Sequence, residues 1–303
     1  QLTFSLYNHF RGDFMRRMSD KLRQLHALKN RSILDDSLTK EYRIKHRGFI
    51  GECKLDQWLN DTPYIKYDDL YLTIDKDTIQ LDTALFIGHH VIIIDAKNYK
   101  GHYKISDTSW TNEFVTIDNP ILHISRTQSI LSKVINPHYL HIWMVFVDND
   151  FKPHRPIQLP HVYMPYEKSR LLFDLSQFNH RKDESLNIQK LMQNQVSGKH
   201  FDPPIRCDDF TIQPGLLCPH CKNDLSEKIK RRYKYVTCTH CNLKISAQNL
   251  VKFNIEDWIY IYQKGITLKE ALNWCPTVSK DLIYNVLKKH FNSNALKRNS
   301  TYT

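Results

Sequence analysis

The stretch from Gln80 to Gly101 is QLDTALFIGHHVIIIDAKNYKG, and it decides the fold of the segment around it. A turn at Gly88-His89-His90 separates a strand-like run that opens at Asp82 from a short β-branched run, Val91–Ile94. An antiparallel hairpin brings the end of its second strand back beside the start of its first. The pattern therefore predicts that Asp82 and Asp95 lie side by side.

Two carboxylates and a lysine at the end of a buried strand favour metal-dependent phosphodiester chemistry. Lys97 lies two residues after Asp95, so both side chains point to the same face of the strand. Carboxylate oxygens suit Mg²⁺, and a lysine can hold a nucleophilic water or the attacked phosphate. The plain alternative is a solvated strand end with a salt bridge, which is the usual meaning of an isolated Asp-x-Lys. The apolar run before Asp95 and the second carboxylate at Asp82 favour the metal site.

These residues resemble the nuclease-related domain family, a branch of the PD-(D/E)XK restriction-endonuclease-like superfamily. The core of the resemblance is IDAKNYKG after LDTALFI. Upstream, Arg47–Glu52 leads into LDQWL, as in the first helix of the family, which has a glycine and a glutamate. Downstream, Asn119-Pro120 begins a helix-like run that contains Gln128, where the family often has a glutamine. One departure is Asp95, since the family more often has Glu at that position.

The resemblance implies an α/β fold of the restriction-endonuclease type, with a mixed sheet flanked by helices, and nuclease activity. A helix before mixed strands, followed by a helix and a further strand, is independently an α/β order. In this interpretation Asp82 and Asp95 hold one or two Mg²⁺ (or Mn²⁺) ions with the Ala96 carbonyl, and Lys97 orients the attacking water. We expect Glu52 to bind metal or orient Lys97. We expect Gln128 to contact the substrate.

Composition indicates a globular protein with a polyanionic partner. The chain has 303 residues, 41% of them hydrophobic, and a formal net charge of +11. Positive charge of this size fits nucleic acid, although it also fits an acidic membrane surface or no specific partner. We expect nucleic acid, and DNA rather than RNA. No run approaches the ~20 apolar residues that span a bilayer, and the N-terminus does not resemble a signal peptide, so we expect no membrane partner. The sequence leaves a homodimer open.

Two CxxC pairs predict a structural zinc ion. Sixteen residues separate Cys218-Pro-His-Cys221 from Cys238-Thr-His-Cys241, which is the spacing of a four-thiolate zinc ribbon. The alternative, a redox-active CxxC, needs one such pair on a thioredoxin-like frame rather than two matched ones. Metal-binding cysteines favour a reducing compartment, so we expect a cytoplasmic protein. The basic segment Lys228–Tyr235, in which Tyr233 and Tyr235 alternate with cations, fits either nucleic acid or a solvated hairpin.

The C-terminal residues predict a pair of helices. Thr267 and Glu270 form a capping-box pattern, and a second helix follows a break at Cys275-Pro276. The pair resembles a helix-turn-helix, although most short helical pairs do not bind DNA. The whole chain is therefore predicted to contain a helical extension (1–45), a nuclease-like core (46–200), a linker (201–214), a zinc ribbon (215–252) and a helical, helix-turn-helix-like unit (253–303).

The leading hypothesis is a metal-dependent nuclease that hydrolyses phosphodiester bonds. Two hypotheses from other classes remain: a non-catalytic nucleic-acid-binding regulator, and a scaffold that binds proteins through its zinc ribbon. The Asp82–Asp95–Lys97 set argues against the regulator, because a binding protein gains nothing from carboxylates beside a polyanion.

Overall fold

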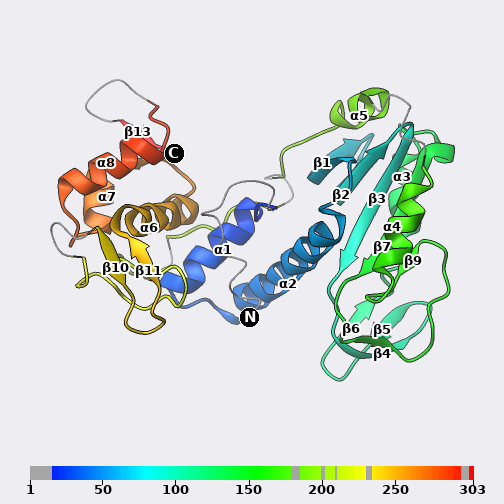
Figure 1. Cartoon of the computed structure of the whole chain (residues 1–303), viewed down its shortest axis with the longest axis horizontal. Helices are drawn as coiled ribbons and strands as arrows, with labels where there is room; N and C mark the ends of the chain where they lie inside the picture. Colours follow the sequence, from blue (N-terminus) through cyan, green and yellow to red (C-terminus); the bar gives the residue numbers. More distant parts are fainter. Residues whose placement is uncertain (1–15, 179–184, 199–201, 209, 230–233, 295–299) are drawn as a thin grey trace. The chain divides into compact units, whose positions relative to one another are not determined.

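The computed structural model describes residues 16–178, 185–198, 202–208, 210–229, 234–294 and 300–303 (Figure 1). The chain divides into two compact units. The sheet unit consists of residues 15–17 and 44–201, and the cysteine unit of residues 18–43 and 202–303. The predicted N-terminal extension and the predicted C-terminal parts therefore share one unit instead of forming separate pieces.

A five-stranded mixed sheet forms the centre of the sheet unit, in the order β1-β2-β3-β7-β9. The first three strands are antiparallel, whereas β7 and β9 run parallel to β3. The strands are β1 (Ile65–Ile74), β2 (Asp77–Ile87), β3 (His90–Lys97), β7 (Leu140–Phe146) and β9 (Val162–Tyr163). The predicted mixed α/β sheet is confirmed.

Helices cover both faces of this sheet (Figure 1). One face packs its apolar side chains against α3 and α5, and the other against α2 and α4. The helices are α2 (Asp36–Leu59), α3 (Leu122–Leu131), α4 (Lys168–Ser176) and α5 (Ser185–Met192). Strand β3 is buried from Val91 to Ile94 because it contributes to both faces, as its continuous β-branched run predicts.

A second, four-stranded sheet follows β3 in the chain, with the order β6-β5-β4-β8. Its strands are β4 (Gly101–Ile105), β5 (Ser109–Thr111), β6 (Thr116–Asp118) and β8 (Phe151–Pro153). An aromatic cluster stabilises this sheet. In this cluster Phe146, at the end of β7, stacks on Phe151 with 4.3 Å between the ring centroids. This sheet therefore begins beside the ends of β3 and β7, where the candidate site lies.

The cysteine unit packs helices around a core that includes Cys218 and Cys238. Its elements are α1 (Asp20–Arg31), β10 (Tyr235–Thr237), β11 (Lys244–Ser246), α6 (Ala247–Tyr262), β12 (Ile266–Thr267), α7 (Leu268–Trp274), α8 (Lys280–His290) and β13 (Thr301–Tyr302). The capping box of Thr267 and Glu270 is present at the start of α7. Five residues, 275–279, separate α7 from α8, slightly more than a helix-turn-helix usually has.

Two predicted boundaries fall inside helices. Helix α2 continues through 45/46 from the cysteine unit into the sheet unit, and α6 continues through 252/253. An unbroken helix thus joins the predicted zinc ribbon to the C-terminal helices. Its N-cap residue is Ser246, whose hydroxyl accepts a hydrogen bond from the Asn249 N–H. The basic residues 230–233 lie outside the described residues.

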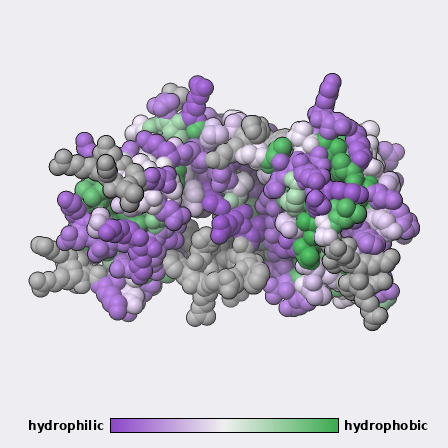
Figure 2. All heavy atoms as spheres, turned by 90° about the horizontal axis from the view of Figure 1, so that it is seen from above, coloured by the Kyte–Doolittle hydropathy of each residue, from purple (hydrophilic) through white to green (hydrophobic). Residues whose placement is uncertain are grey.

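Hydrophilic residues predominate on the face shown in Figure 2, where hydrophobic residues form only small patches. Among the described residues, none of the helices combines the length and the apolar character needed to cross a membrane.

Candidate functional site

The β2–β3 hairpin brings Asp82 and Asp95 to the same end of the sheet. Its turn consists of Gly88 and His89, and a φ of +57° at Gly88 favours glycine there. The strand pairing runs from Ile87–His90 to Thr83–Ile94, so the next position of the same register places Asp82 opposite Asp95. Burial, followed by the charges of Asp95 and Glu52, raises the pKa of Asp82 well above its ordinary value.

Lys97 forms an ion pair with Asp95. The Lys97 Nζ atom lies 2.7 Å from Asp95 Oδ1, and both side chains are about one-fifth exposed, at 20% and 23%. Asp95 Oδ1 is buried, and the Lys97 ammonium group is the charged partner that lies against it. Burial opposes the charge of Lys97, but Asp95 outweighs burial and raises the pKa of Lys97. The lysine is therefore a cation held against a buried carboxylate oxygen.

Helix α2 brings Glu52 to the same end of the sheet, with only 15% of the side chain exposed. Burial raises the pKa of Glu52 to about 7, with further contributions from Asp69, Asp56 and Asp95, while Arg16 lowers it. Arg16 Nη1 contacts both Glu52 Oε2, at 3.2 Å, and the Asp82 carbonyl, at 2.7 Å, so the Glu52 carboxylate lies near the main chain of Asp82. The role of Glu52 toward a metal or Lys97 stays a prediction.

A close contact between Gly51 and Asn98 sets the position of Glu52. A Cβ atom on Gly51 would lie 2.7 Å from Asn98 Cβ, so only glycine lets α2 approach the end of β3 this closely. The Asn98 amide donates to the Arg47 carbonyl at 2.9 Å, and Lys54 reaches both Asn98 and Asp148. The glycine of Arg47–Glu52 therefore has a packing role.

Gln128 is not brought into contact with these residues. It is exposed on α3, and within the described part of the chain no hydrogen bond or ion pair joins its side chain to them. The preceding Asn119 has a structural role, because its Oδ1 accepts from the Ile121 N–H and its amide donates to the Asp107 carbonyl. The role of Gln128 toward a substrate remains a prediction.

Several charged residues near the site are not part of the Asp82–Asp95–Lys97 motif, so the motif could not predict them. Arg16 contacts Glu52, and Lys66 on β1 contacts Asp56 and Asp68. Polar alternation along β1 indicates an amphipathic strand, but no local pattern links Arg16 to a helix 36 residues later.

The oxygens present fit a hard divalent cation. Mg²⁺ usually takes one or two protein carboxylates and completes its shell with waters and phosphate oxygens. Asp82, Asp95 and the Ala96 carbonyl offer such a set of oxygens, and the hairpin register places the two aspartates opposite each other. In the described part of the chain, no three carboxylate groups approach one another as closely as the four cysteines do.

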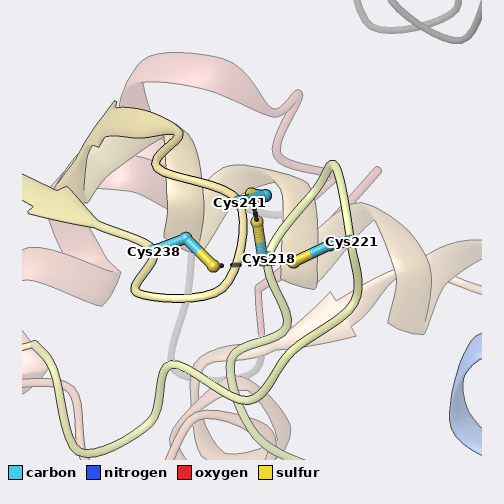
Figure 3. Close-up of side chains that lie close together, drawn as sticks. All are labelled: Cys218, Cys221, Cys238 and Cys241. Carbon is cyan, nitrogen blue, oxygen red and sulfur yellow. Dashed lines mark hydrogen bonds between the residues drawn. The ribbon is translucent and has the colours of Figure 1, made fainter.

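The four cysteines of the two CxxC pairs converge (Figure 3). Their Sγ atoms all lie within 4.8 Å of one another, at 3.6 Å for Cys218–Cys241 and 3.5 Å for Cys221–Cys238. Tetrahedral zinc with Zn–S bonds of 2.3 Å separates its sulfurs by about 3.8 Å. Burial opposes ionisation of Cys238, but the backbone N–H groups of Cys241 and His240 outweigh it and lower the pKa to about 7. The cluster can therefore hold zinc without its histidines, of which His240 is exposed.

Comparison with known proteins identifies the segment around the candidate site. Residues 47–148 match the family model of the nuclease-related domain. This segment is therefore similar to nuclease-related domains. The matched segment contains Glu52, Asp82, Asp95 and Lys97, whereas Arg16 and the four cysteines lie outside it.

A solved structure, protein VC1899 from Vibrio cholerae, is similar at 16% identity over 55% of this chain and 58% of that one, with a TM-score of 0.26. The chain thus spans less than two thirds of that protein, and a likeness this low supports no conclusion about activity. No curated protein matches the chain.

Replacing Gly51 by alanine should displace α2 from Asn98. We expect Gly51→Ala to destabilise the fold by about 1–3 kcal/mol, because the new methyl group overpacks the contact. Gly48 on the same helix is the matched control, since a Cβ there would meet only Glu52 Oε1, at 3.9 Å. Gly48→Ala should be neutral or stabilising by about 0.5–1 kcal/mol. Urea unfolding measures both, and equal stability of the two variants would contradict the packing role.

The cysteine cluster predicts about one zinc ion per chain. Elemental analysis of the purified protein should find it, and Cys218→Ser should reduce it strongly. Cys53→Ala is the control, because Cys53 is a free cysteine outside the cluster. Removing zinc with a chelator should disorder the β10–β11 pair and leave the sheet unit folded, since the cluster belongs to the core of the cysteine unit. Zinc content that Cys218→Ser leaves unchanged would refute the site.

Proposed function

We propose that the protein is a metal-dependent nuclease that hydrolyses phosphodiester bonds, with DNA as its preferred substrate. The observation that supports this most is the gathering of Asp82, Asp95 and Lys97 at one end of the β2–β3 hairpin, inside a nuclease-related domain. A binding protein would have little use for carboxylates in this position, since they repel phosphates.

The carboxylates supply the metal ligands in this proposal. Asp82 and Asp95 would hold Mg²⁺ or Mn²⁺ together with the Ala96 carbonyl, and Glu52 lies close enough to complete or orient the set. The bound ion would polarise the scissile phosphate and lower the pKa of a bound water. These groups come from α2, β2 and β3 and lie at one end of the sheet. Packed helices and strands, rather than a loop, therefore set their relative positions.

Lys97 has a separate role. Its Nζ atom lies 2.7 Å from Asp95 Oδ1, so it is held at the edge of the proposed metal site without being a ligand. From there the ammonium group orients the attacking water and offsets the negative charge that develops on the phosphate.

The cysteine unit is proposed to hold the nucleic acid. Helix α8 exposes Lys280, Lys288 and Lys289, and Lys288 lies over the ring of the exposed Tyr284, 4.9 Å from its centroid. These groups offer phosphate contacts without carboxylates of the proposed metal site among them. Their presence favours binding through the predicted helix-turn-helix over protein docking.

Removing either carboxylate should abolish cleavage. We expect Asp82→Ala and Asp95→Ala to reduce cleavage of plasmid and single-stranded DNA in Mg²⁺ or Mn²⁺ to the level seen in EDTA. Lys97→Ala should lower the rate by about 10²–10³-fold, the usual effect of losing one group that stabilises transition-state charge. Asp61→Ala is the control, because Asp61 is an exposed acid of the same domain. Full activity in both aspartate variants would refute the site, and preferential cleavage of RNA would refute the preference for DNA.

The charge on α8 should set the salt dependence of DNA binding. We expect Lys288→Ala with Lys289→Ala to weaken binding and to flatten the log–log salt slope by about 0.9 for each duplex phosphate that the protein no longer neutralises. Fluorescence anisotropy at several salt concentrations measures the slope. The pair Lys76→Ala and Lys168→Ala removes the same charge from exposed positions of the sheet unit. If both double variants change the slope equally, α8 has no special role in holding DNA.

A further inference from the structure

Arg16 is a buried arginine whose hydrogen-bonding capacity is fully used. Only 1% of its side chain is exposed, and it lies outside the nuclease-related domain, which begins at residue 47. An arginine side chain has five N–H donors. Acceptors from three elements, α2, β1 and β2, surround the guanidinium group.

Two of these acceptors are carboxylates on consecutive turns of α2. Arg16 Nη1 donates to Glu52 Oε2 at 3.2 Å, and Arg16 Nε donates to Asp56 Oδ2 at 3.1 Å. Residues four apart lie on the same face of a helix, so one planar guanidinium group holds both side chains. Glu52 therefore has a fixed, buried partner in Arg16.

The remaining acceptors belong to β1 and β2. Arg16 Nη2 donates to Asp68 Oδ1 at 2.8 Å and to Thr83 Oγ1 at 2.6 Å, and Nη1 donates to the Asp82 carbonyl at 2.7 Å. A fourth carboxylate, Asp69, lies 3.5 Å from Nη1. The contact to Asp82 is made to its main chain, so the Asp82 carboxylate stays free.

The strands are irregular at this point. Asp69 has a φ of +53°, which is uncommon for a residue other than glycine. The pairing of β1 with β2 passes from Asp68–Thr83 to Leu70–Leu81, and Asp69 and Asp82 are not paired with each other. At the same point the Asp82 carbonyl accepts a hydrogen bond from Arg16. A strained residue that the surroundings hold in place is typical of functional sites.

We propose that Arg16 is a positioning residue of the nuclease site, which fixes the Glu52 carboxylate and the main chain at Asp82. This inference rests on the proposed function. It also means that the segment 47–148 is incomplete by itself, because a residue from outside it orients its acidic groups. The contacts favour positioning over inhibition, since the guanidinium group engages neither the Asp82 carboxylate nor Asp95 or Lys97.

The test compares two adjacent arginines. Arg16→Ala should lower kcat by about 10–100-fold, the usual effect of losing a group that orients metal-site ligands. Affinity for DNA, measured in EDTA, should stay within about twofold of the unaltered protein, because a buried side chain makes no phosphate contact. Arg17→Ala is the matched control, since Arg17 is exposed, and it should leave kcat unchanged. Circular dichroism checks that each variant is folded.

A double-mutant cycle separates positioning from a general effect on the fold. If Arg16 acts through Glu52, Arg16→Ala should lower kcat much less in a Glu52→Gln background than in the unaltered protein. The same double-mutant cycle, measured on the midpoint of urea unfolding, gives the coupling between the Arg16 and Glu52 side chains without an activity assay. Should Arg16→Ala fail to fold, Arg16→Lys, which keeps the charge but loses the planar fork of donors, replaces it in the same cycle.

Each possible result either supports or overturns the positioning role of Arg16. A folded Arg16→Ala variant with unchanged kcat would overturn the inference, and a raised kcat would overturn it in favour of an inhibitory contact. Additive effects of the Arg16 and Glu52 changes would show that Arg16 does not act through Glu52. If the unaltered protein cleaves nothing with Mg²⁺ or Mn²⁺, the proposed function fails and the positioning role fails with it, whereas a failure of Arg16 alone leaves the nuclease intact.

Discussion

Repulsion among carboxylates is the constraint on which the rest of the sheet unit depends. Six of them lie close enough to affect one another: Glu52, Asp56, Asp68, Asp69, Asp82 and Asp95. Among the described residues, three cations form ion pairs with this group: Arg16, Lys66 and Lys97. The excess of negative charge favours bound protons or a bound cation. Burial, and then the neighbouring carboxylates, raise the pKa values of Asp82 and Glu52.

The packing around this cluster follows from the same constraint. Acidic groups remain together only where the surrounding structure holds them, and the sheet unit does so with tightly determined contacts. Gly51 lets α2 approach Asn98, and the two-residue turn at Gly88 sets the register of β2 on β3. Arg16 and Lys66 then divide the cluster, because they neutralise its outer members and leave Asp82 and Asp95 at the strand ends. The division separates a structural group of charges from a group that is open to a ligand.

Local patterns predicted the parts of the protein that depend on short-range geometry. The neighbouring positions of Asp82 and Asp95 follow from strand alternation and a two-residue turn, and the convergence of four cysteines follows from the CxxC spacing. Arg16 was missed because its partners lie 36 to 67 residues away, and no periodicity relates such distances. Helix α6 was also missed, although Val251, Ile255 and Trp258 are among its buried residues at helical spacing. The predicted boundary at 252/253 falls inside this helix.

The path of the chain has a consequence for how such a protein can arise or be dissected. Each compact unit is assembled from separate stretches, because residues 18–43 interrupt the sheet unit and belong with residues 202–303. A recombination event that transferred only residues 47–148 would carry the motif and leave behind Arg16, the residue that neutralises Glu52. Likewise, a single proteolytic cut near residue 202 would free no complete unit, since α1 would stay attached to the sheet unit through α2. Neither unit is therefore encoded by one continuous stretch of the sequence.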